Sequence, residues 1–432
     1  MKGIIQTIII ATLLISANFA YAQVPSPSKE QEKGILLLGG TVHTGTGEVI
    51  ENSAIAFERG KIVFVGKRSE AGSYPGFEKI DVSGKHVYPG MILMSSQVGL
   101  VEIGGVRATQ DASEVGTLNP SVRSVIAYNT DSEIIPVLRS NGVSLVQVCP
   151  GGEMISGSSS VVNLDAWNWE DAAVKTDEGV WLNWPGLYSF SGYGNNRKME
   201  KSKTYDTNVQ MLESLFSEAK AYNGMPVNSK LAAMKGLFDG SQTLYISADQ
   251  TKSIIESISF ARKMGVQKVV LAGADEDALL LADFLRSNQV SVILAHVHRT
   301  PKRKDSYTRK PFELAAGFKN AGITAAVTYS GGSGSMNLPF VAGQCVAYGL
   351  NKEEALQTVT LNPARILGID STTGSIEVGK DANIVVSEGD MLDIRTNKIN
   401  YSYISGRSIN LDNKHKRLYR KFSEKYGQVV VE

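Results

Sequence analysis

The chain has 432 residues, of which 42% are apolar and 20% charged. This composition supplies a large core and excludes a disordered or membrane-embedded protein. The 44 basic and 43 acidic side chains nearly cancel, so no excess of positive charge draws the protein to nucleic acid.

The N-terminus has the pattern of an export signal. Lys2 precedes an apolar run over residues 4–15, and the sequence "ANFAYAQ" follows, in which Ala20-Tyr21-Ala22 fits the small-x-small rule for signal peptidase. We predict that residues 1–22 are removed and that the mature protein is periplasmic or extracellular, with no membrane span. The alternative is an uncleaved membrane anchor.

Short strand signals separated by turn residues occupy residues 30–88, and the same pattern returns over residues 371–412. Arg59-Gly60 and Gly39-Gly40 are examples of the turns. Two all-β segments that bracket the rest of the chain predict one small β-sandwich built from both ends. Residues 413–432 form a basic tail with Leu418 and Phe422 at helical spacing, which is typical of a solvated packing helix or of an interaction segment.

Between these flanks, residues 89–370 predict an α/β domain. The sequence "PGMILM" opens it with a short buried strand, and "SLVQVCP" gives another. From residue 241, apolar runs such as "TLYIS", "QKVVLAG" and "VSVILAH" alternate with segments of helical period. Continuous apolar strands indicate a parallel sheet covered by helices. We therefore predict a (β/α)₈ TIM-like barrel, and the competing architecture is a doubly wound open sheet.

Several motifs resemble one known family. They are "LLLGGTVHTGTGEVIENSAIAFERGKIVFVG", "YPGMI", "TLNPARILGIDSTTGSIEVGKDANIVV" and "ISGR". Together they resemble the amidohydrolase superfamily, most closely the imidazolonepropionase-like and dihydroorotase-like hydrolases of cyclic amides. The resemblance covers nearly all of the chain after residue 22. It implies a barrel that hydrolyses C–N bonds with one or two divalent metals at the C-terminal ends of its strands.

The resemblance also implies metal-ligand positions, and this sequence departs from them. The family places an Asp and a His-x-His pair after the Pro-Gly turn, whereas Leu93, Ser95 and Gln97 stand here. The expected histidines of the fifth and sixth strands are replaced by Ser247 and Ala272.

The eighth-strand Asp of the family should fall where Tyr329 and Ser330 stand, and the fourth-strand ligand is not assigned. Neutral hydroxyls and amides compete poorly with water for zinc. We therefore expect no bound metal and no other cofactor.

Other features offer alternative sites. His296 and His298 are two residues apart at the end of a predicted strand, a spacing that suits two ligands of a re-sited zinc or simple hydrogen bonding. The acidic run over residues 275–277 either supplies carboxylates to the same mouth or stabilises a helix N-terminus. Residues 149–171, rich in Gly and Ser, predict a flexible loop in which Trp167 and Trp169 line a ligand pocket or cover the rim.

These patterns support three hypotheses of function. The first is an exported, catalytically silent member of the family that binds a small molecule or forms a hetero-oligomer with an active relative. The second is an active C–N bond hydrolase that uses a metal at His296 and His298 or a metal-free mechanism. The third is a purely structural role in assembly. Cys149 and Cys345 lie in apolar contexts and are expected as buried thiols, with a disulfide as the alternative.

Overall fold

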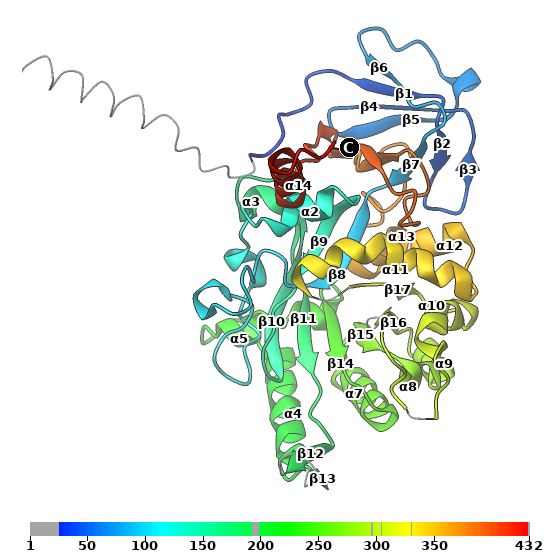
Figure 1. Cartoon of the computed structure of the whole chain (residues 1–432). Coiled ribbons are helices and arrows are strands. Elements are labelled where there is room, and N and C mark those ends of the chain that lie inside the picture. Colours follow the sequence, from blue (N-terminus) through cyan, green and yellow to red (C-terminus); the bar gives the residue numbers. More distant parts are fainter. Residues whose placement is uncertain (1–25, 192–197, 295–296, 304, 330, 431–432) are drawn as a thin grey trace, which may run out of the picture.

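A computed structural model describes residues 26–191, 198–294, 297–303, 305–329 and 331–430. Two layered parts make up the molecule, a β-sandwich and an eight-stranded barrel sheet with its helices (Figure 1). No helix within these ranges is both long enough and apolar enough to cross a membrane. The predicted export signal at residues 1–22 and the residues His296 and Ser330 lie outside the described residues.

The β-sandwich uses both ends of the chain, as the sequence predicts. Its four-stranded sheet has the order β5-β4-β1-β6 and its six-stranded sheet the order β20-β19-β18-β7-β2-β3. Leu37, Phe57, Val87, Ile384 and Tyr403 are buried together as its core, with the rings of Phe57 and Tyr403 4.9 Å apart. The strand bounds are β1 Ile35–Leu38, β2 Thr41–His43, β3 Val49–Ile50, β4 Ser53–Glu58, β5 Lys61–Lys67, β6 Glu78–Asp81, β7 His86–Pro89, β18 Ile384–Ser387, β19 Ile399–Ile404 and β20 Arg407–Ser408.

The second part is a nearly closed barrel with the strand order β17-β16-β15-β14-β11-β10-β9-β8. Its strands are β8 Met91–Ser96, β9 Val143–Val148, β10 Ile155–Asn163, β11 Ala173–Asn183, β14 Thr243–Ser247, β15 Lys268–Ala274, β16 Ser291–Leu294 and β17 Ala325–Ala326. Between the two end strands, the Thr328 hydroxyl donates to the Met94 carbonyl at 2.5 Å. The backbone N–H groups of Ile92 and Val327 donate to the carbonyls of residues 359 and 358, so a short segment bridges the remaining seam. The TIM-like barrel is therefore confirmed.

One strand departs from the predicted β/α alternation. β10 runs antiparallel to both β9 and β11, whereas the other neighbouring pairs of the sheet are parallel. The Gly- and Ser-rich stretch expected to be a flexible loop is instead this nine-residue strand. Serines can be buried in this strand because their hydroxyls are hydrogen-bonded. The Ser158 hydroxyl donates to the Asp177 carboxylate at 3.0 Å, and the Ser160 hydroxyl accepts the Asp177 backbone N–H at 2.9 Å.

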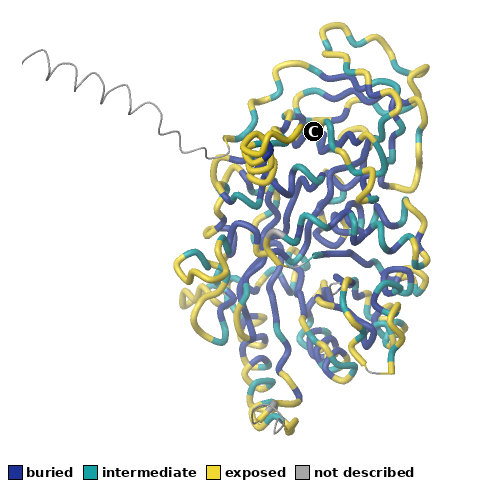
Figure 2. The backbone as a smooth tube through the Cα atoms, in the orientation of Figure 1, coloured by how far each residue is buried: buried dark blue, intermediate teal, exposed yellow. Residues whose placement is uncertain are grey.

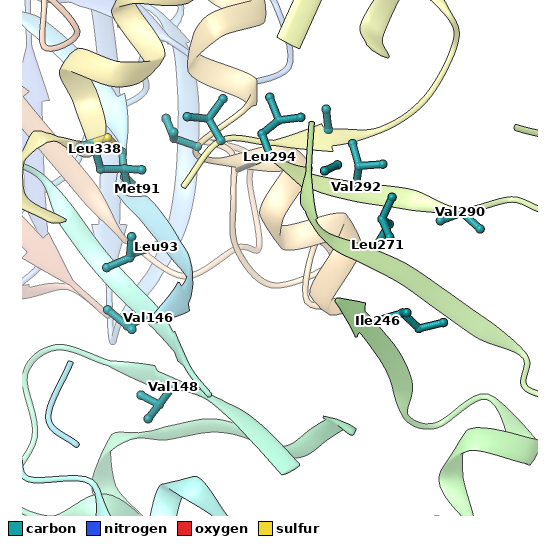
Figure 3. Close-up of a cluster of buried hydrophobic side chains, with 14 of the residues drawn as sticks. Met91, Leu93, Val146, Val148, Ile246, Leu271, Val290, Val292, Leu294 and Leu338 are labelled. Carbon is teal, nitrogen blue, oxygen red and sulfur yellow. The ribbon is translucent and has the colours of Figure 1, made fainter. Parts of the chain in front are cut away.

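Alternate residues of the strands face opposite sides of the sheet. One buried cluster takes side chains from every barrel strand and is therefore the barrel interior. It also contains three residues of helix α13 (Leu361–Leu367) and one residue after it. Its members are Ile92, Met94, Leu145, Cys149, Val161, Trp181, Tyr245, Val270, Ala272, Ile293, Ala326, Ala364, Ile366, Leu367 and Ile369. The other face carries Met91, Leu93, Val146, Leu271 and Val292, which pack against the surrounding helices (Figure 3).

Helices and one hairpin surround the sheet. Helix α7, for example, buries Ile254, Ile258 and Ala261 on one face and ends at Gly265, whose φ of +90° is a conformation that favours glycine. The helix bounds are α2 Ile134–Arg139, α3 Trp169–Ala172, α4 Tyr205–Ala221, α5 Ser229–Ala232, α6 Gly236–Asp239, α7 Thr251–Met264, α8 Glu276–Leu279, α9 Ala282–Ser287, α10 Lys310–Asn320, α11 Leu338–Gln344, α12 Lys352–Gln357, α13 Leu361–Leu367 and α14 Lys414–Lys425, and the hairpin is β12 Tyr188–Ser191 with β13 Lys198–Lys201.

A buried ion cluster joins the barrel to the sandwich and to the start of the described chain. The Asp165 carboxylate, which has no exposed side-chain surface, lies 2.7 Å from Arg139 of α2 and 3.4 Å from Arg407 of β20. It also accepts the backbone N–H of Ser28 at 3.2 Å. Cys149 and Cys345 are both buried free thiols, as the first of the two alternatives predicted.

Candidate functional site: the C-terminal ends of the barrel strands

The C-terminal ends of the parallel strands meet at the barrel end that points away from the β-sandwich (Figure 1). We call this end the mouth; its residues include Ser95, Asn183, Ser247, Ala272 and Thr328. Asn183 pairs with Ser247, and Ser247 pairs with Ala272, so three neighbouring strands place these residues in one row. Ser247 is exposed, Asn183 is half-buried and Ala272 is buried. The register therefore places Ser247 and Ala272 side by side at the mouth.

The first strand reaches the mouth with an irregular backbone. Leu93 pairs with Val146 but Ser96 pairs with Val148, so β8 contains one residue more than β9 over this interval. The extra residue is accommodated at Ser95, whose φ is +56°. Regular alternation along this strand would point the side chains of Ser95 and Gln97 into the barrel together, and the bulge breaks this alternation.

Ser95 faces the interior and Gln97 lies at the surface. The Ser95 backbone N–H donates to Oε1 of Gln147 at 3.1 Å, and its side chain lies close to the Cys149 thiol. Burial raises the pKa of Cys149 to about 12, so this thiol stays protonated and is a poor nucleophile. Gln97 is exposed, with its amide lying over Gly151 of the loop between β9 and β10.

Below the mouth, a buried carboxyl group occupies the barrel interior. Glu178 on β11 is 2% exposed and receives hydrogen bonds from the Gln147 amide at 2.7 Å and the Tyr245 hydroxyl at 2.8 Å. The Ser159 hydroxyl also donates to it. Burial raises the pKa of Glu178, although these three donors and Lys175 lower it. Burial is the largest of these effects, so the neutral form of the Glu178 carboxyl group is favoured more here than in water.

The sequence did not single out this network. Trp181 stacks on Tyr245 with ring centroids 4.8 Å apart, so the network lies next to two large aromatic rings. Gly179 makes room for them, because a Cβ there would meet the Tyr245 ring at 2.3 Å. The available signal in the sequence was the run "VWLNW" after "KTDEG". This run predicts a fourth strand, but it does not predict that Glu178 points inward, because Asp177 has a φ of +49° and interrupts the alternation of side chains.

The structure also supplies the fourth-strand position that the sequence left unassigned. β11 is the strand before β14, and its residues nearest the mouth are Trp181, which is interior, and Asn183. The Asn183 amide donates to the carbonyls of Gly152 and Glu153 at 3.2 and 2.6 Å. An indole and an engaged amide are not ligands of a divalent cation.

The acidic run near the mouth is neutralised by a neighbouring loop. Asp275 accepts the N–H of Asp277 at 2.9 Å as the N-cap of α8. Lys302 lies 2.9 Å from Asp275 and 3.1 Å from Asp277, and Arg303 lies 2.5 Å from Asp277. The capping reading of this acidic run is therefore confirmed, and the carboxylates are engaged with cations of the chain itself.

His298 lies in the loop after β16, with its ring centroid 6.0 Å from that of Phe312. His296, the other member of the predicted pair, lies outside the described residues. Within the part of the chain that is described, no three His, Cys, Asp or Glu side chains come together in a way that could hold a metal ion.

The two tryptophans expected near a ligand pocket lie at the other end of the barrel. Because β10 runs from the mouth toward the sandwich, the connection from β10 to β11 emerges on the sandwich side. Trp167 is 69% exposed there, and the Trp169 ring lies 6.0 Å from the Arg123 guanidinium. The antiparallel strand thus separates Trp167 and Trp169 from Ser247 and Ala272.

The side chains at the mouth differ from the ligands that a catalytic metal requires. Zinc and similar ions take imidazole, thiolate or carboxylate ligands. The described residues at the family's ligand positions are Leu93, Ser95, Gln97, Ser247, Ala272 and Tyr329. Leu93 and Ala272 have no donor atom for a metal, and the other four side chains offer only hydroxyls or an amide, so this set does not fit the divalent metals on which the family relies.

A mostly parallel barrel beside a sandwich from both chain ends, with a mouth formed by strand ends, is the architecture that the amidohydrolase resemblance implies. The sequence model of the amidohydrolase family matches residues 195–410, half of the chain. The chain belongs to the amidohydrolase family.

Individual relatives agree with this assignment. The imidazolonepropionase of Symbiobacterium thermophilum is 23% identical over 372 residues, which cover 78% of this chain and 84% of that protein. The imidazolonepropionase of Flavobacterium psychrophilum is 38% identical over only 89 residues, about a fifth of each chain. The crystal structure of an amidohydrolase from Thermotoga maritima superposes with a TM-score of 0.74 at 22% identity, covering 87% of this chain and 99% of that one; at this identity it supports the fold alone.

Proposed function

We propose that this member of the amidohydrolase family does not carry out metal-dependent hydrolysis and acts as an exported binding protein or subunit. The observation that supports the proposal is the donor set of the mouth. Ser247 and Ala272 stand in register on adjacent strands, where two imidazoles of the family are expected.

The energetic consequence of this donor set is large. A catalytic metal lowers the pKa of its bound water from 15.7 to about 7, which corresponds to roughly 12 kcal/mol in hydroxide availability. A general base alone contributes about 10²–10⁴ in rate. Glu178 is a weak candidate for that base, because it is buried below the mouth and its carboxyl oxygens already accept hydrogen bonds from three side chains of the barrel interior. The chain therefore has no described group that offsets the loss of the metal.

The test is metal analysis of the purified protein after incubation with Zn²⁺, Mn²⁺ or Fe²⁺ and gel filtration. We expect well below one equivalent of each metal per chain, and no imidazolonepropionase activity in the same preparation. About one tightly bound equivalent would overturn the proposal. If metal were found, the variants His296→Ala and His298→Ala would decide whether it is bound at the alternative site, since only that site would then be lost.

The subunit role is tested by co-expression with an active amidohydrolase of the same cell. We expect the two chains to elute together in size-exclusion chromatography with light scattering. A monomer in the presence of every exported relative would leave small-molecule binding as the remaining role. Export itself is tested by mass spectrometry of the mature N-terminus, which should begin at residue 23.

A further inference from the structure

Helix α14 is oriented in an unusual way on the body of the protein. Its inward stripe is polar: Asn413 and Ser423 are 4% and 3% exposed, and Arg417 and Arg420 lie between them. Asn413 donates to the Ser140 hydroxyl at 2.9 Å. The helix is thus held to α2 and its surroundings by polar contacts, whereas a surface helix normally buries its apolar face.

Ion pairs complete this polar attachment. Arg417 lies 3.1 Å from Glu133 next to α2, and Arg420 lies 2.7 Å from Asp412. Because these pairs face the body, Leu418, Phe422 and Tyr426 are turned away from it, whereas Tyr419 lies at the edge of the helix and lines a hollow with Val137 and Met336 of the body. The attachment therefore fixes which face of α14 is presented to the outside.

The outward stripe is apolar and aromatic. Leu418, Phe422 and Tyr426 are 42%, 48% and 66% exposed, and Tyr419 is 47% exposed. They follow each other at three- and four-residue steps and so form one face of the helix. Together with His415 they line a shallow hollow of about 310 Å³. α14 stands out as an exposed segment at the surface in Figure 2.

Positive charge is concentrated on the same helix. α14 contains six Lys and Arg residues and one acidic residue, whereas the whole chain has a formal charge of only +1. Lys414, Lys421 and Lys425 are exposed and follow one edge of the apolar stripe, and Lys416 lies at the other edge. An exposed apolar face flanked by lysines fits the headgroup region of an anionic membrane, where the rings enter the interface and the ammonium groups meet lipid phosphates.

The start of the described chain lies on the same side. Ser28 is held by Asp165, and Asp165 is held by Arg139 of α2, the helix that also carries α14. The apolar run at residues 4–15 is a short distance before this point in sequence. The first described residues and α14 therefore lie on the same side of the molecule (Figure 1).

From these observations we infer that the outward face of α14, formed by Leu418, Phe422 and Tyr426 with the flanking lysines, is a docking surface for an anionic lipid membrane. The inference is independent of the proposed loss of metal-dependent hydrolysis. It assigns the protein a peripheral position on the membrane surface, with the barrel mouth at the far end of the molecule.

The experiment is vesicle co-sedimentation of residues 23–432, which contain all described elements. The vesicles are phosphatidylcholine alone, or phosphatidylcholine with phosphatidylglycerol at a ratio of 7:3. We expect binding to the anionic vesicles only, weakened by added salt because salt screens the lysines. No binding to anionic vesicles at low salt would overturn the inference.

Two variants test the two parts of the surface. Leu418→Ser with Phe422→Ser should reduce the partition coefficient by more than about tenfold, because apolar burial in the interface is lost. Lys414→Gln with Lys421→Gln and Lys425→Gln should reduce it about a hundredfold, at about a factor of five per charge. Unchanged binding of either variant would contradict the assignment of the surface to α14.

The matched control replaces two other exposed apolar side chains, Val378→Ser with Ile394→Ser, which are 62% and 68% exposed on other segments. This control should bind vesicles like the unchanged protein, and circular dichroism should show equal thermal unfolding for every variant. If light scattering instead showed a self-association that Leu418→Ser with Phe422→Ser abolishes, without vesicle binding, the face would belong to a second copy and the membrane inference would be wrong.

Discussion

The buried carboxyl group of Glu178 makes the stability of this protein depend on pH in a defined direction. In the folded protein burial raises its pKa above the ordinary value of 4.5. Between 4.5 and the folded pKa, the unfolded chain is ionised and the folded chain holds one more proton. The free energy of unfolding therefore falls as pH rises through this window, by about 1.4 kcal/mol per pH unit.

Glu178→Gln removes this titration and keeps the network. The amide oxygen can accept the bonds now made by Gln147 and Ser159, and the amide nitrogen can donate to the Tyr245 hydroxyl. We expect the variant to be similar to the unchanged protein below pH 4.5, and to be the more stable of the two at pH 8. The difference should grow by about 1.4 kcal/mol per pH unit until the folded pKa is reached.

The assay is urea denaturation followed by tryptophan fluorescence at half-unit steps from pH 4.5 to pH 8. Taking the difference between the two proteins cancels all other titrating groups that they share. Parallel pH profiles would refute the reasoning, and so would a variant that loses stability with rising pH. Glu51→Gln is the control, because this carboxyl group is exposed and its removal should leave the profile parallel to that of the unchanged protein.

Three further predictions concern the mouth, the buried ion cluster around Asp165 and the seam between the first and last barrel strands. Ser247→His with Ala272→His should bind Zn²⁺ in isothermal titration calorimetry, because these paired residues would place two imidazoles on neighbouring strands about 5 Å apart. Asp165→Ala should lower the free energy of unfolding by about 3–5 kcal/mol, since it leaves the buried Arg139 without its carboxylate. Thr328→Val should cost about 1–2 kcal/mol in the same urea assay, since the bond from this hydroxyl across the barrel seam is lost.

Each of these predictions has a control. For zinc, Ser247→His alone should bind much more weakly than the double variant, and equal binding would contradict the pairing. For the ion cluster, Asp283→Ala removes a carboxylate that is 90% exposed and paired with Arg286, and it should cost at most about 1 kcal/mol. If Asp165→Ala lowered the free energy of unfolding by no more than Asp283→Ala does, burial of the ion pair would not determine its contribution to stability. For the seam, Thr328→Ser keeps the hydroxyl and should retain most of the stability.

Much of the barrel could be predicted from sequence because its parallel strands are buried on both faces. The run "TLYIS" coincides with β14, and "QKVVLAG" lies within one residue of β15. Such strands are continuous apolar runs, and the period of the following helix, as in α7, separates them clearly.

The miss at β10 has an equally physical cause. Residues such as Ser158, Ser159 and Ser160 are typical of loops, but here each hydroxyl makes a hydrogen bond inside the sheet. Side-chain partners that are 17 to 19 residues away in sequence cannot be read from local composition. The same limit hid Glu178, whose inward direction depends on the irregular backbone at Asp177.

The bulge at Ser95 also limits how this protein could be re-engineered. Histidines introduced at residues 95 and 97 would not face a common ion, because the extra residue in β8 has rotated the strand end and Gln97 lies at the surface. A two-imidazole clamp at these positions would therefore require a change of the backbone near Ser95 that brings residues 95 and 97 to one face, in addition to the two changes of side chain.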